Sequence, residues 1–259
     1  MVGPDHSIAF DSIAADYDAT RGGLERGASF ARSFAVHLRG AGPILEVGVG
    51  TGAVALPLVG IAGRPVVGVD LSLPMLARGA ERLPGAVAQA DAYRLPFGDA
   101  SFDDVVLAWV LQLVPDQAGL LRECRRVLRP GGRILVIVAA PTSLGDADRD
   151  MHEAEAVLIK GPELSAAADR TDEARQAAVD AGLAVVEQGL TEPQTFEQAP
   201  ATVADTWSRR LHGWMVDLDD EAFARIVQPA IDALLALPEP ERPRQRTHAH
   251  PLFVLEGTP

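Results

Sequence analysis

Continuous apolar runs of strand length recur along the first half of the chain, and they constrain the fold more than any other feature of the sequence. The runs cover residues 44–47, 66–69, 105–108 and 134–138, with 86–90 as a weaker fifth. Segments with helical periodicity separate most of them. Strands that are apolar without alternation are buried on both faces, and strands that alternate with helices pair in parallel. The sequence therefore predicts an α/β fold with a doubly wound, mostly parallel sheet.

Two helices of this core have readable boundaries. Ser72 is placed to cap a helix that runs through Leu83, where a proline and a glycine follow. Asp116 is placed to cap another helix through Leu128, and the Pro-Gly-Gly stretch at 130–132 is expected to terminate it. Serine and aspartate side chains accept hydrogen bonds from the first free amides of a helix, while proline and glycine end helices.

The rest of the chain is organised around this core (residues 43–140). Residues 1–42 are expected to form a helical arm, with helices over 7–20 and 24–38. Residues 141–259 are expected to hold lid insertions and the last two of seven strands. The elements predicted there are a helix over 171–181, a strand over 183–188, a helical insertion over 197–237 and a strand over 252–256. Because no repeat or linker divides the chain, we predict a single domain over 1–259.

Composition narrows the class of protein and of partner. The chain has 259 residues, of which 47% are hydrophobic and 23% charged, as in globular domains. One cysteine, Cys124, excludes an intrachain disulfide, and the absence of a signal-peptide pattern leads us to expect a cytoplasmic location. No apolar run is long enough to span a membrane. The net charge of −13 and the dispersed arginines disfavour nucleic acid and anionic membranes. We therefore expect a small-molecule ligand, no metal, and a monomer or homodimer.

A glycine-rich turn follows the first strand. Gly48, Gly50 and Gly52 lie between that strand and a helix, and Glu46 lies inside the strand. Glycines allow a sharp turn and a close approach of a ligand, and the following helix presents its amide groups and positive dipole end. The turn therefore predicts a small-molecule binding site.

The glycine pattern alone leaves two classes of ligand open. Gly48, Gly50 and Ala53 satisfy the G-x-G-x-x-A pattern of dinucleotide sites, and Asp70 follows about twenty residues later. Glu46 and a second strand-end acid, Asp91, instead favour a ligand with a ribose diol and an adenine amino group but no pyrophosphate.

Four linked motifs carry a resemblance to a known family. They are ILEVGVGTGAVALPL (44–58), VVGVDLSLPMLARG (66–79), ADAYRLPFGDASFDDVVLAWVLQLVPD (90–116) and RVLRPGGRILV (126–136). In order and spacing the chain resembles the class I S-adenosylmethionine-dependent methyltransferases, in the small-molecule branch similar to ubiquinone/menaquinone biosynthesis methyltransferases. Residues 10–21 also look like that family's leading helix. Beyond residue 141 only the layout of elements is similar.

The resemblance implies a Rossmann-like methyltransferase fold, S-adenosyl-L-methionine as cofactor and a role for each matching position. The amino-acid end of the cofactor would be held by the strand acid, the glycine turn and the arm. The ribose and adenine would be held by residues after the second and third strands, and the methyl end by residues after the fourth. These residues are Tyr17, Arg21, Glu46, Gly48, Val49, Gly50, Gly52, Asp70, Leu71, Met75, Asp91, Ala92, Ala108 and Trp109.

No catalytic residue follows firmly from the sequence. Transfer from a sulfonium needs mainly alignment and exclusion of water, with a base only for a protonated nucleophile. Many relatives carry histidine where this chain has Gln112, and His152 is the first choice among the histidines because it lies in an insertion. Methyl transfer to a small O-, N- or C-nucleophile is the predicted reaction. The alternatives are an NAD(P)-dependent oxidoreductase and a catalytically silent cofactor-binding regulatory protein.

The insertions are expected to serve as a lid. Residues 142–170 and 191–248 are inserted where the chain can reach the carboxyl ends of the strands, the edge at which open α/β sheets bind ligands. Together with the arm they are expected to cover that edge and to order on ligand binding. Trp207 and Trp214 share one helical face there, either as packing residues or as the wall of an acceptor site.

Overall fold

A computed structural model describes residues 6–138, 141–145, 147–158, 170–212, 215 and 218–258. The chain divides into two compact units. The first comprises residues 1–139, 170–192 and 250–259, and the second residues 140–169 and 193–249. The insertions predicted after the fifth and sixth strands thus form a compact unit of their own. The predicted single-domain organisation and the predicted role of the insertions as a lid stay predictions. Among the described residues, no helix combines the length and the apolar character needed to cross a membrane.

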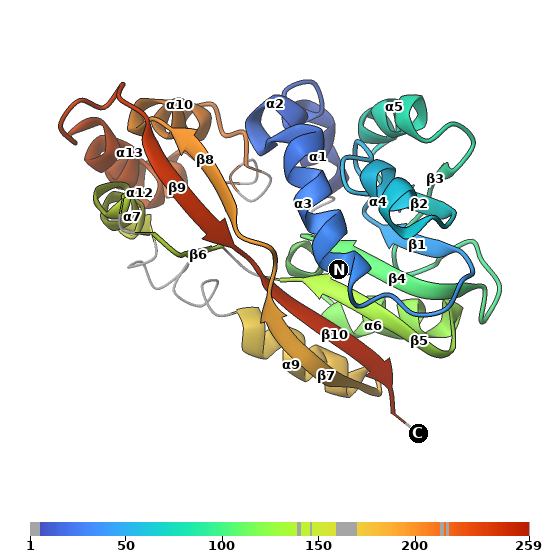
Figure 1. The fold of residues 1–259 in the computed structure, drawn as a ribbon. Helices are drawn as coiled ribbons and strands as arrows, with labels where there is room; N and C mark the ends of the chain where they lie inside the picture. The colour runs from blue at the N-terminus through green and yellow to red at the C-terminus, as the bar shows by residue number, and fades with distance from the viewer. Residues whose placement is uncertain are drawn as a thin grey trace. The chain divides into compact units, whose positions relative to one another are not determined.

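The first unit is built on a seven-stranded sheet with the order β3-β2-β1-β4-β5-β10-β7 (Figure 1). The five strands from β3 to β5 are parallel, and β10 is antiparallel to both of its neighbours. This arrangement confirms the predicted mostly parallel, doubly wound sheet. The strands are β1 (Ile44–Val47), β2 (Val66–Asp70), β3 (Val87–Gln89), β4 (Phe102–Ala108), β5 (Leu128–Ile137), β7 (Leu183–Leu190) and β10 (Pro251–Gly257).

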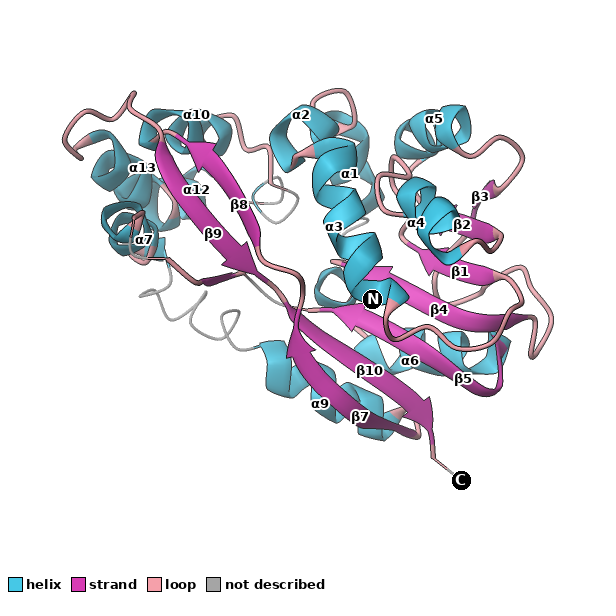
Figure 2. Ribbon diagram, viewed as in Figure 1, coloured by secondary structure: helices cyan, strands magenta, loops and turns pink. Residues whose placement is uncertain are grey.

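Helices cover both faces of this sheet (Figure 2). Successive residues of β4 point into two different cores, Val105 and Leu107 into one and Val106 into the other. The continuous apolar runs of the sequence are therefore explained by burial on both faces. The helices are α1 (His6–Ile13), α2 (Tyr17–Arg21), α3 (Gly23–Ala35), α4 (Ala55–Ala62), α5 (Leu73–Arg82), the 3-10 helix η1 (Leu111–Leu113), α6 (Gln117–Val127) and α9 (Arg170–Asp180).

The predicted capping residues of α5 and α6 are confirmed. The Ser72 hydroxyl accepts from the Met75 amide at 3.3 Å, and the Asp116 carboxylate accepts from the Gly119 amide at 2.7 Å. The predicted end of α6 was wrong in its detail. The Pro-Gly-Gly stretch at 130–132 belongs to β5, because Leu128 already has an extended backbone and pairs with Phe102 of β4.

The arm also differs from the prediction. One helix was expected over 7–20, but α1 ends at Ile13 and α2 begins at Tyr17. The Asp16 amide bonds to the Ile13 carbonyl at 3.1 Å, which closes a tight turn instead of continuing the helix. Gly22, with φ +77°, then separates α2 from α3. The arm is therefore three helices rather than two.

The second unit combines helices with an antiparallel sheet of order β6-β9-β8. The helices predicted over 197–237 are present, but β8 and β9 were missed because their polar sequences lack the apolar character of the other strands. The elements are β6 (Thr142–Ser143), α7 (Arg149–Glu155), β8 (Gln194–Gln198), α10 (Pro200–Ser208), α12 (Asp220–Ile226), α13 (Gln228–Leu235) and β9 (Arg244–Ala249).

The second unit has its own core and buried ion pairs. Trp207 packs in that core, as the packing alternative proposed, whereas Trp214 and residues 159–169 lie outside the described residues. The Arg246 guanidinium, nearly fully buried, pairs with Asp148 at 2.9 Å and with Glu155 at 2.6 Å. These pairs connect α7 to β9, so charge neutralisation stabilises a buried arginine within a polar strand.

Candidate functional site

The glycine turn after β1 has the backbone that its sequence predicts. Gly48, Gly50 and Gly52 have φ values of +76°, +52° and +76°, which residues with side chains rarely adopt. A Cβ at Gly48 would overlap a methyl group of Val110, whereas a Cβ at Gly50 would meet nothing within 4 Å. Gly48 is thus required by packing, and Gly50 leaves an open approach for a ligand.

Asp70, at the end of β2, holds this turn in place. One carboxylate oxygen accepts from the Gly50 amide at 2.8 Å, and the other accepts from the Ser72 amide at 2.9 Å. Burial raises the pKa of Asp70, and these two amide bonds oppose that rise. Since each carboxylate oxygen has two lone pairs, both can accept a further bond from a ligand hydroxyl.

Glu46 is the most unusual acid of the site. Its side chain lies inside β1 with 2% of its surface exposed, and Oε2 has no hydrogen-bond partner in the structure. Burial, and secondarily the nearby charge of Asp70, raise the pKa of Glu46 well above its usual value. Buried carboxyl groups in proteins are normally paired. An orphaned oxygen beside an open glycine turn fits a ligand that carries an ammonium group.

The predicted adenine residues follow β2 and β3. Asp70 and Gln89 are paired residues of these strands, so Asp91 follows at the same edge of the sheet. The Asp91 carboxylate is exposed and accepts from the Tyr93 amide at 2.9 Å, and Ala92 is partly buried. Leu71 is 45% exposed and Met75 is buried on α5. The structure thus places an exposed acid and one exposed apolar side chain, that of Leu71, after these two strands. Because Met75 is buried, its contact with an adenine stays a prediction.

The arm is fastened to the glycine turn by residues that sequence reasoning missed. Asp18, next to Tyr17 on α2, accepts from the Thr51 hydroxyl at 2.7 Å and pairs with Arg82 of α5. Arg82 also donates to the Thr51 carbonyl at 2.9 Å. Thr51 lies between two of the turn glycines, so α2 is bonded directly to the predicted cofactor site. Polar contacts so distant in sequence leave no periodic signal that could have revealed them.

Tyr17 and Arg21 lie in this same region. Burial raises the pKa of the Tyr17 hydroxyl, and the positive charges of Arg21 and Arg26 oppose that rise. Asp70 also contributes to the electrostatics of Tyr17, which locates the tyrosine near the turn. The arm therefore brings two basic side chains, those of Arg21 and Arg26, close to Tyr17.

Trp109 ends β4 in a left-handed conformation, with φ +59°. Its ring packs edge-on against Phe30 at 4.3 Å and against His250 at 5.3 Å between centroids. The Arg26 guanidinium lies 4.8 Å from the Trp109 ring centroid. Ala108, the residue before it, is buried. Neither Arg26 nor His250 was among the site residues predicted from the sequence.

The candidate catalytic residues lie in different units. Gln112 is half-buried in η1, three residues after Trp109. His152 is exposed on α7 of the second unit. These positions do not assign a catalytic function to either residue, so a catalytic role for Gln112 or His152 stays a prediction.

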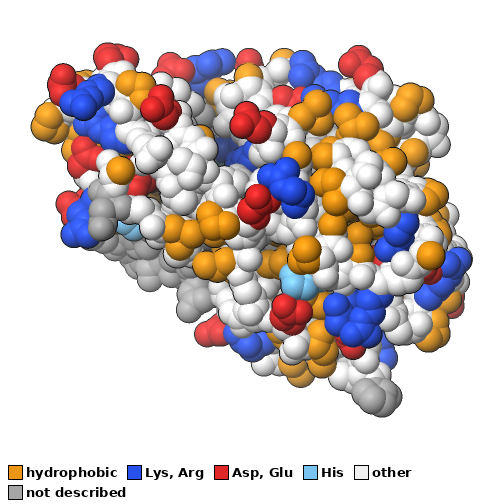
Figure 3. All heavy atoms as spheres, viewed as in Figure 1, with side chains coloured by type: hydrophobic (Ala, Val, Ile, Leu, Met, Phe, Trp, Pro, Cys, Tyr) orange, Lys and Arg blue, Asp and Glu red, His pale blue; other side chains and the backbone are white. Residues whose placement is uncertain are grey.

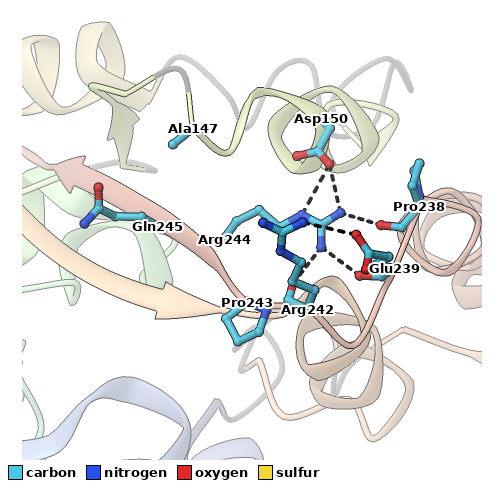
Figure 4. Close-up of a pocket in the computed structure, with 8 residues that line it drawn as sticks. All are labelled: Ala147, Asp150, Pro238, Glu239, Arg242, Pro243, Arg244 and Gln245. Carbon is cyan, nitrogen blue, oxygen red and sulfur yellow. Dashed lines mark hydrogen bonds and ion pairs between the residues drawn. The ribbon is translucent and has the colours of Figure 1, made fainter.

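The second unit has a surface depression (Figure 4), but this depression lacks the features of a ligand-binding site. Arg244 lies at its centre and donates to Asp150 at 3.1 Å and to the carbonyls of Pro238, Glu239 and Arg242. Because the guanidinium is already saturated by these partners, the depression offers no unpaired charge to a ligand. Its lining residues are Ala147, Asp150, Pro238, Glu239, Arg242, Pro243, Arg244 and Gln245.

Charged side chains are scattered over the face drawn in Figure 3. Arginine side chains (blue) form separate spots among acidic and apolar ones, without a continuous basic track on that face. The prediction that nucleic acid is not a partner stays a prediction.

Comparison with known proteins shows a similarity to one family. Residues 45–136 match the model of a methyltransferase domain. The matched residues span the glycine turn, Asp70, Asp91 and Trp109, which confirms the predicted resemblance. The domain match favours a methyltransferase cofactor over the dinucleotide that the glycine pattern alone left open.

The chain is also similar to curated relatives, of which two serve as examples. A demethylmenaquinone methyltransferase of Streptomyces griseus is 40% identical over 138 residues, which are 51% of this chain and 60% of the relative. One of Mycobacterium tuberculosis (H37Rv) is 41% identical over 137 residues, 51% of this chain and 57% of the relative. The chain thus spans about 60% of the length of these relatives.

A solved structure extends the likeness of fold to nearly the whole chain. It is a methyltransferase from Thermotoga maritima that is described as dependent on S-adenosylmethionine, with 21% identity and a TM-score of 0.55. The match covers 98% of this chain and 100% of the other. At this identity the likeness concerns the fold, and it agrees with the seven-stranded sheet described above.

Proposed function

We propose that this protein transfers the methyl group of S-adenosyl-L-methionine to a small organic acceptor. The observation that carries the proposal is the orphaned carboxyl oxygen of Glu46 beside the open glycine turn. An ammonium group of the cofactor would pair with that oxygen. The curated relatives, named demethylmenaquinone methyltransferases, support methyl transfer and a small organic acceptor.

Each part of the cofactor has matching residues. Glu46 and the backbone of residues 48–52 would hold the amino-acid end, with Tyr17 and Arg21 from the arm at its carboxylate. Asp70 would accept from the ribose hydroxyls, and Asp91 from the adenine amine. Carboxylates bind such donor pairs through charge-assisted hydrogen bonds. Ala108 and Trp109 would line the methyl end.

The protein's part in the reaction is chiefly alignment. When bound, the cofactor supplies a methyl group already activated by its sulfonium. The strands and the glycine turn hold the binding residues on rigid elements, and the aromatic contacts of Trp109 fix the position of its ring. Alignment of this kind contributes roughly 7–11 kcal/mol to a transfer reaction. The residues at this edge therefore need to orient two groups and exclude water.

Calorimetry with three ligands tests the proposal. S-adenosylmethionine and S-adenosylhomocysteine are expected to bind in the micromolar range, and NAD is expected to give no heat of binding. Glu46 explains the difference, because an acid at the glycine turn suits the ammonium of the amino-acid end but not the pyrophosphate of NAD, whereas Asp91 suits the adenine amine of either ligand. Binding of NAD without binding of S-adenosylhomocysteine would favour the oxidoreductase alternative instead. Cofactor binding without methyl transfer to any tested acceptor would favour the regulatory one.

Cofactor binding is also expected to release a proton from Glu46. At any pH below its raised pKa in the free protein, the Glu46 carboxyl is largely protonated. Pairing with an ammonium would lower that pKa. Affinity should therefore rise with pH, by up to about tenfold per unit, until pH passes the pKa of the free protein. Titrations of S-adenosylhomocysteine in phosphate and in Tris, compared at each of several pH values, measure the released proton. Glu46→Gln should abolish the release, whereas equal heats in both buffers at every pH for the wild type would contradict the assignment.

A further inference from the structure

Arg26 is a partly buried residue near the start of α3, and its guanidinium lies close to Trp109 of the candidate site. It lies over the ring of Trp109 at 4.8 Å and over that of Phe30 at 5.4 Å. Nη2 lies 3.1 Å from Nε2 of His250, and Nη1 lies 3.4 Å from the Arg21 carbonyl oxygen. None of these neighbours carries a negative charge.

Arg26 lacks the counter-charge that the more deeply buried arginines of the described residues have. Arg64 pairs with Asp104 at 2.8 Å, and Arg246 pairs with two carboxylates. Within the described ranges, no carboxylate lies at ion-pair distance from Arg26. The chain has 36 acidic residues against 23 basic ones, so acids are not scarce. Removing a charge from water without an ionic partner is costly even when the burial is partial, which suggests that a ligand supplies the anion.

The electrostatic surroundings of Arg26 strengthen this point. Burial, with the like charge of Arg21 as a second cause, lowers the pKa of Arg26 to about 10, so the group stays charged at neutral pH. The positive end of the α3 dipole adds to the local potential, since Arg26 lies in the first turn of that helix. The result is a positive site in an acidic protein.

His250 fixes the guanidinium instead of neutralising it. Because arginine only donates, Nε2 of His250 must accept, and the imidazole is therefore neutral. The His250 amide donates to the Thr191 hydroxyl at 2.9 Å, and its carbonyl accepts from the Thr191 amide at 2.8 Å. A rigid backbone thus holds the ring that orients Arg26. The contacts above occupy two of the five guanidinium N–H groups, and three can still donate.

We propose that Arg26 binds an oxyanion on the methyl acceptor, such as a carboxylate, phenolate or enolate. The inference rests on the proposed methyl-transfer function and adds the chemical class of the acceptor. Arg26 contacts Trp109, the residue expected at the methyl end, whereas the acids Glu46 and Asp70 lie at the glycine turn. Arg26 is therefore assigned to the acceptor and not to the cofactor's carboxylate. A guanidinium can bind a carboxylate through two parallel hydrogen bonds.

Two matched probes test this proposal on the full chain saturated with S-adenosylhomocysteine. 1-Naphthoate carries an oxyanion, and 1-naphthamide has nearly the same shape without the charge. Calorimetry of the wild type should show at least tenfold tighter binding of the naphthoate. Arg26→Gln should reduce this preference to below twofold. Arg32→Gln is the control, because Arg32 lies on the same helix but is exposed and pairs with Glu192 at 2.7 Å; it should keep the preference.

The remaining outcomes separate the alternatives. Arg26→Lys retains the charge and should keep most of the preference, so a loss in Arg26→Gln alone is not explained by misfolding. The dissociation constant of S-adenosylhomocysteine should stay within twofold in Arg26→Gln. A selective loss of cofactor binding would assign Arg26 to the cofactor's carboxylate and overturn the proposal, as would a wild type without preference for the anion. Failure of the wild type to bind S-adenosylhomocysteine would instead overturn the proposed function.

Discussion

Asp70→Ala is expected to weaken the binding of S-adenosylhomocysteine by about 1.5–3 kcal/mol, or about 10- to 150-fold. The carboxylate would accept hydrogen bonds from the ribose hydroxyls. Losing a hydrogen bond to a charged group costs a free energy of this size. It also fixes the glycine turn through the Gly50 amide. Calorimetry at constant pH measures the change in dissociation constant. An unchanged constant would mean that the ribose binds elsewhere.

Asp103→Ala provides a matched control for this prediction. Asp103 also accepts from two backbone amides, those of Ala41 and Gly42, but it lies near the amino end of β4. The ligand is expected to bind at the carboxyl ends of the strands, which lie at the other edge of the sheet. Asp103→Ala should therefore lower the melting temperature while leaving the dissociation constant of S-adenosylhomocysteine unchanged. Similar weakening in both variants would indicate a general loss of structure.

Gly27→Ala is expected to destabilise the protein by about 3 kcal/mol, at the upper end of the cost of overpacking. Gly27 is buried on α3, and a Cβ there would overlap the carbonyl oxygen and carbon of Ala53. These are backbone atoms of the segment between the glycine turn and α4, so they cannot move aside as a flexible side chain would. Urea denaturation measures the loss in the free energy of unfolding.

Gly60→Ala is the control for this substitution. Gly60 is an exposed glycine of α4, and a Cβ there would meet nothing within 4 Å. Alanine is the better helix former, so this variant should gain about 0.5–1 kcal/mol. A Gly27→Ala variant as stable as Gly60→Ala would show that α3 does not pack as closely on this segment as the structure indicates.

The core of the fold could be predicted because its signals are local. The apolar runs of β1, β2, β4 and β5 are buried on both faces. β1 and β2 lie close to their predicted bounds, whereas β4 and β5 begin earlier than predicted, at Phe102 and Leu128. Ser72 and Asp116 cap their helices through bonds to residues three positions away. Short-range patterns of this kind are written directly in the sequence.

The parts that were missed depend on partners far away in the chain. β9 has the polar sequence RQRTHA, and Arg246 can be buried in it only because Asp148 and Glu155 neutralise the guanidinium. Arg26 meets His250 across 224 positions. No window of sequence contains both members of these pairs, so burial and contact at these positions could not be inferred from periodicity or motifs.

The strand order has a consequence for synthesis on the ribosome. β10, near the end of the chain, lies between β5 and β7. During translation, β5 is complete more than a hundred residues before its neighbour emerges, and it meanwhile presents an open edge with apolar side chains. Unpaired apolar edges attract other chains. The nascent protein is therefore expected to depend on holding chaperones until residues 251–257 leave the exit tunnel.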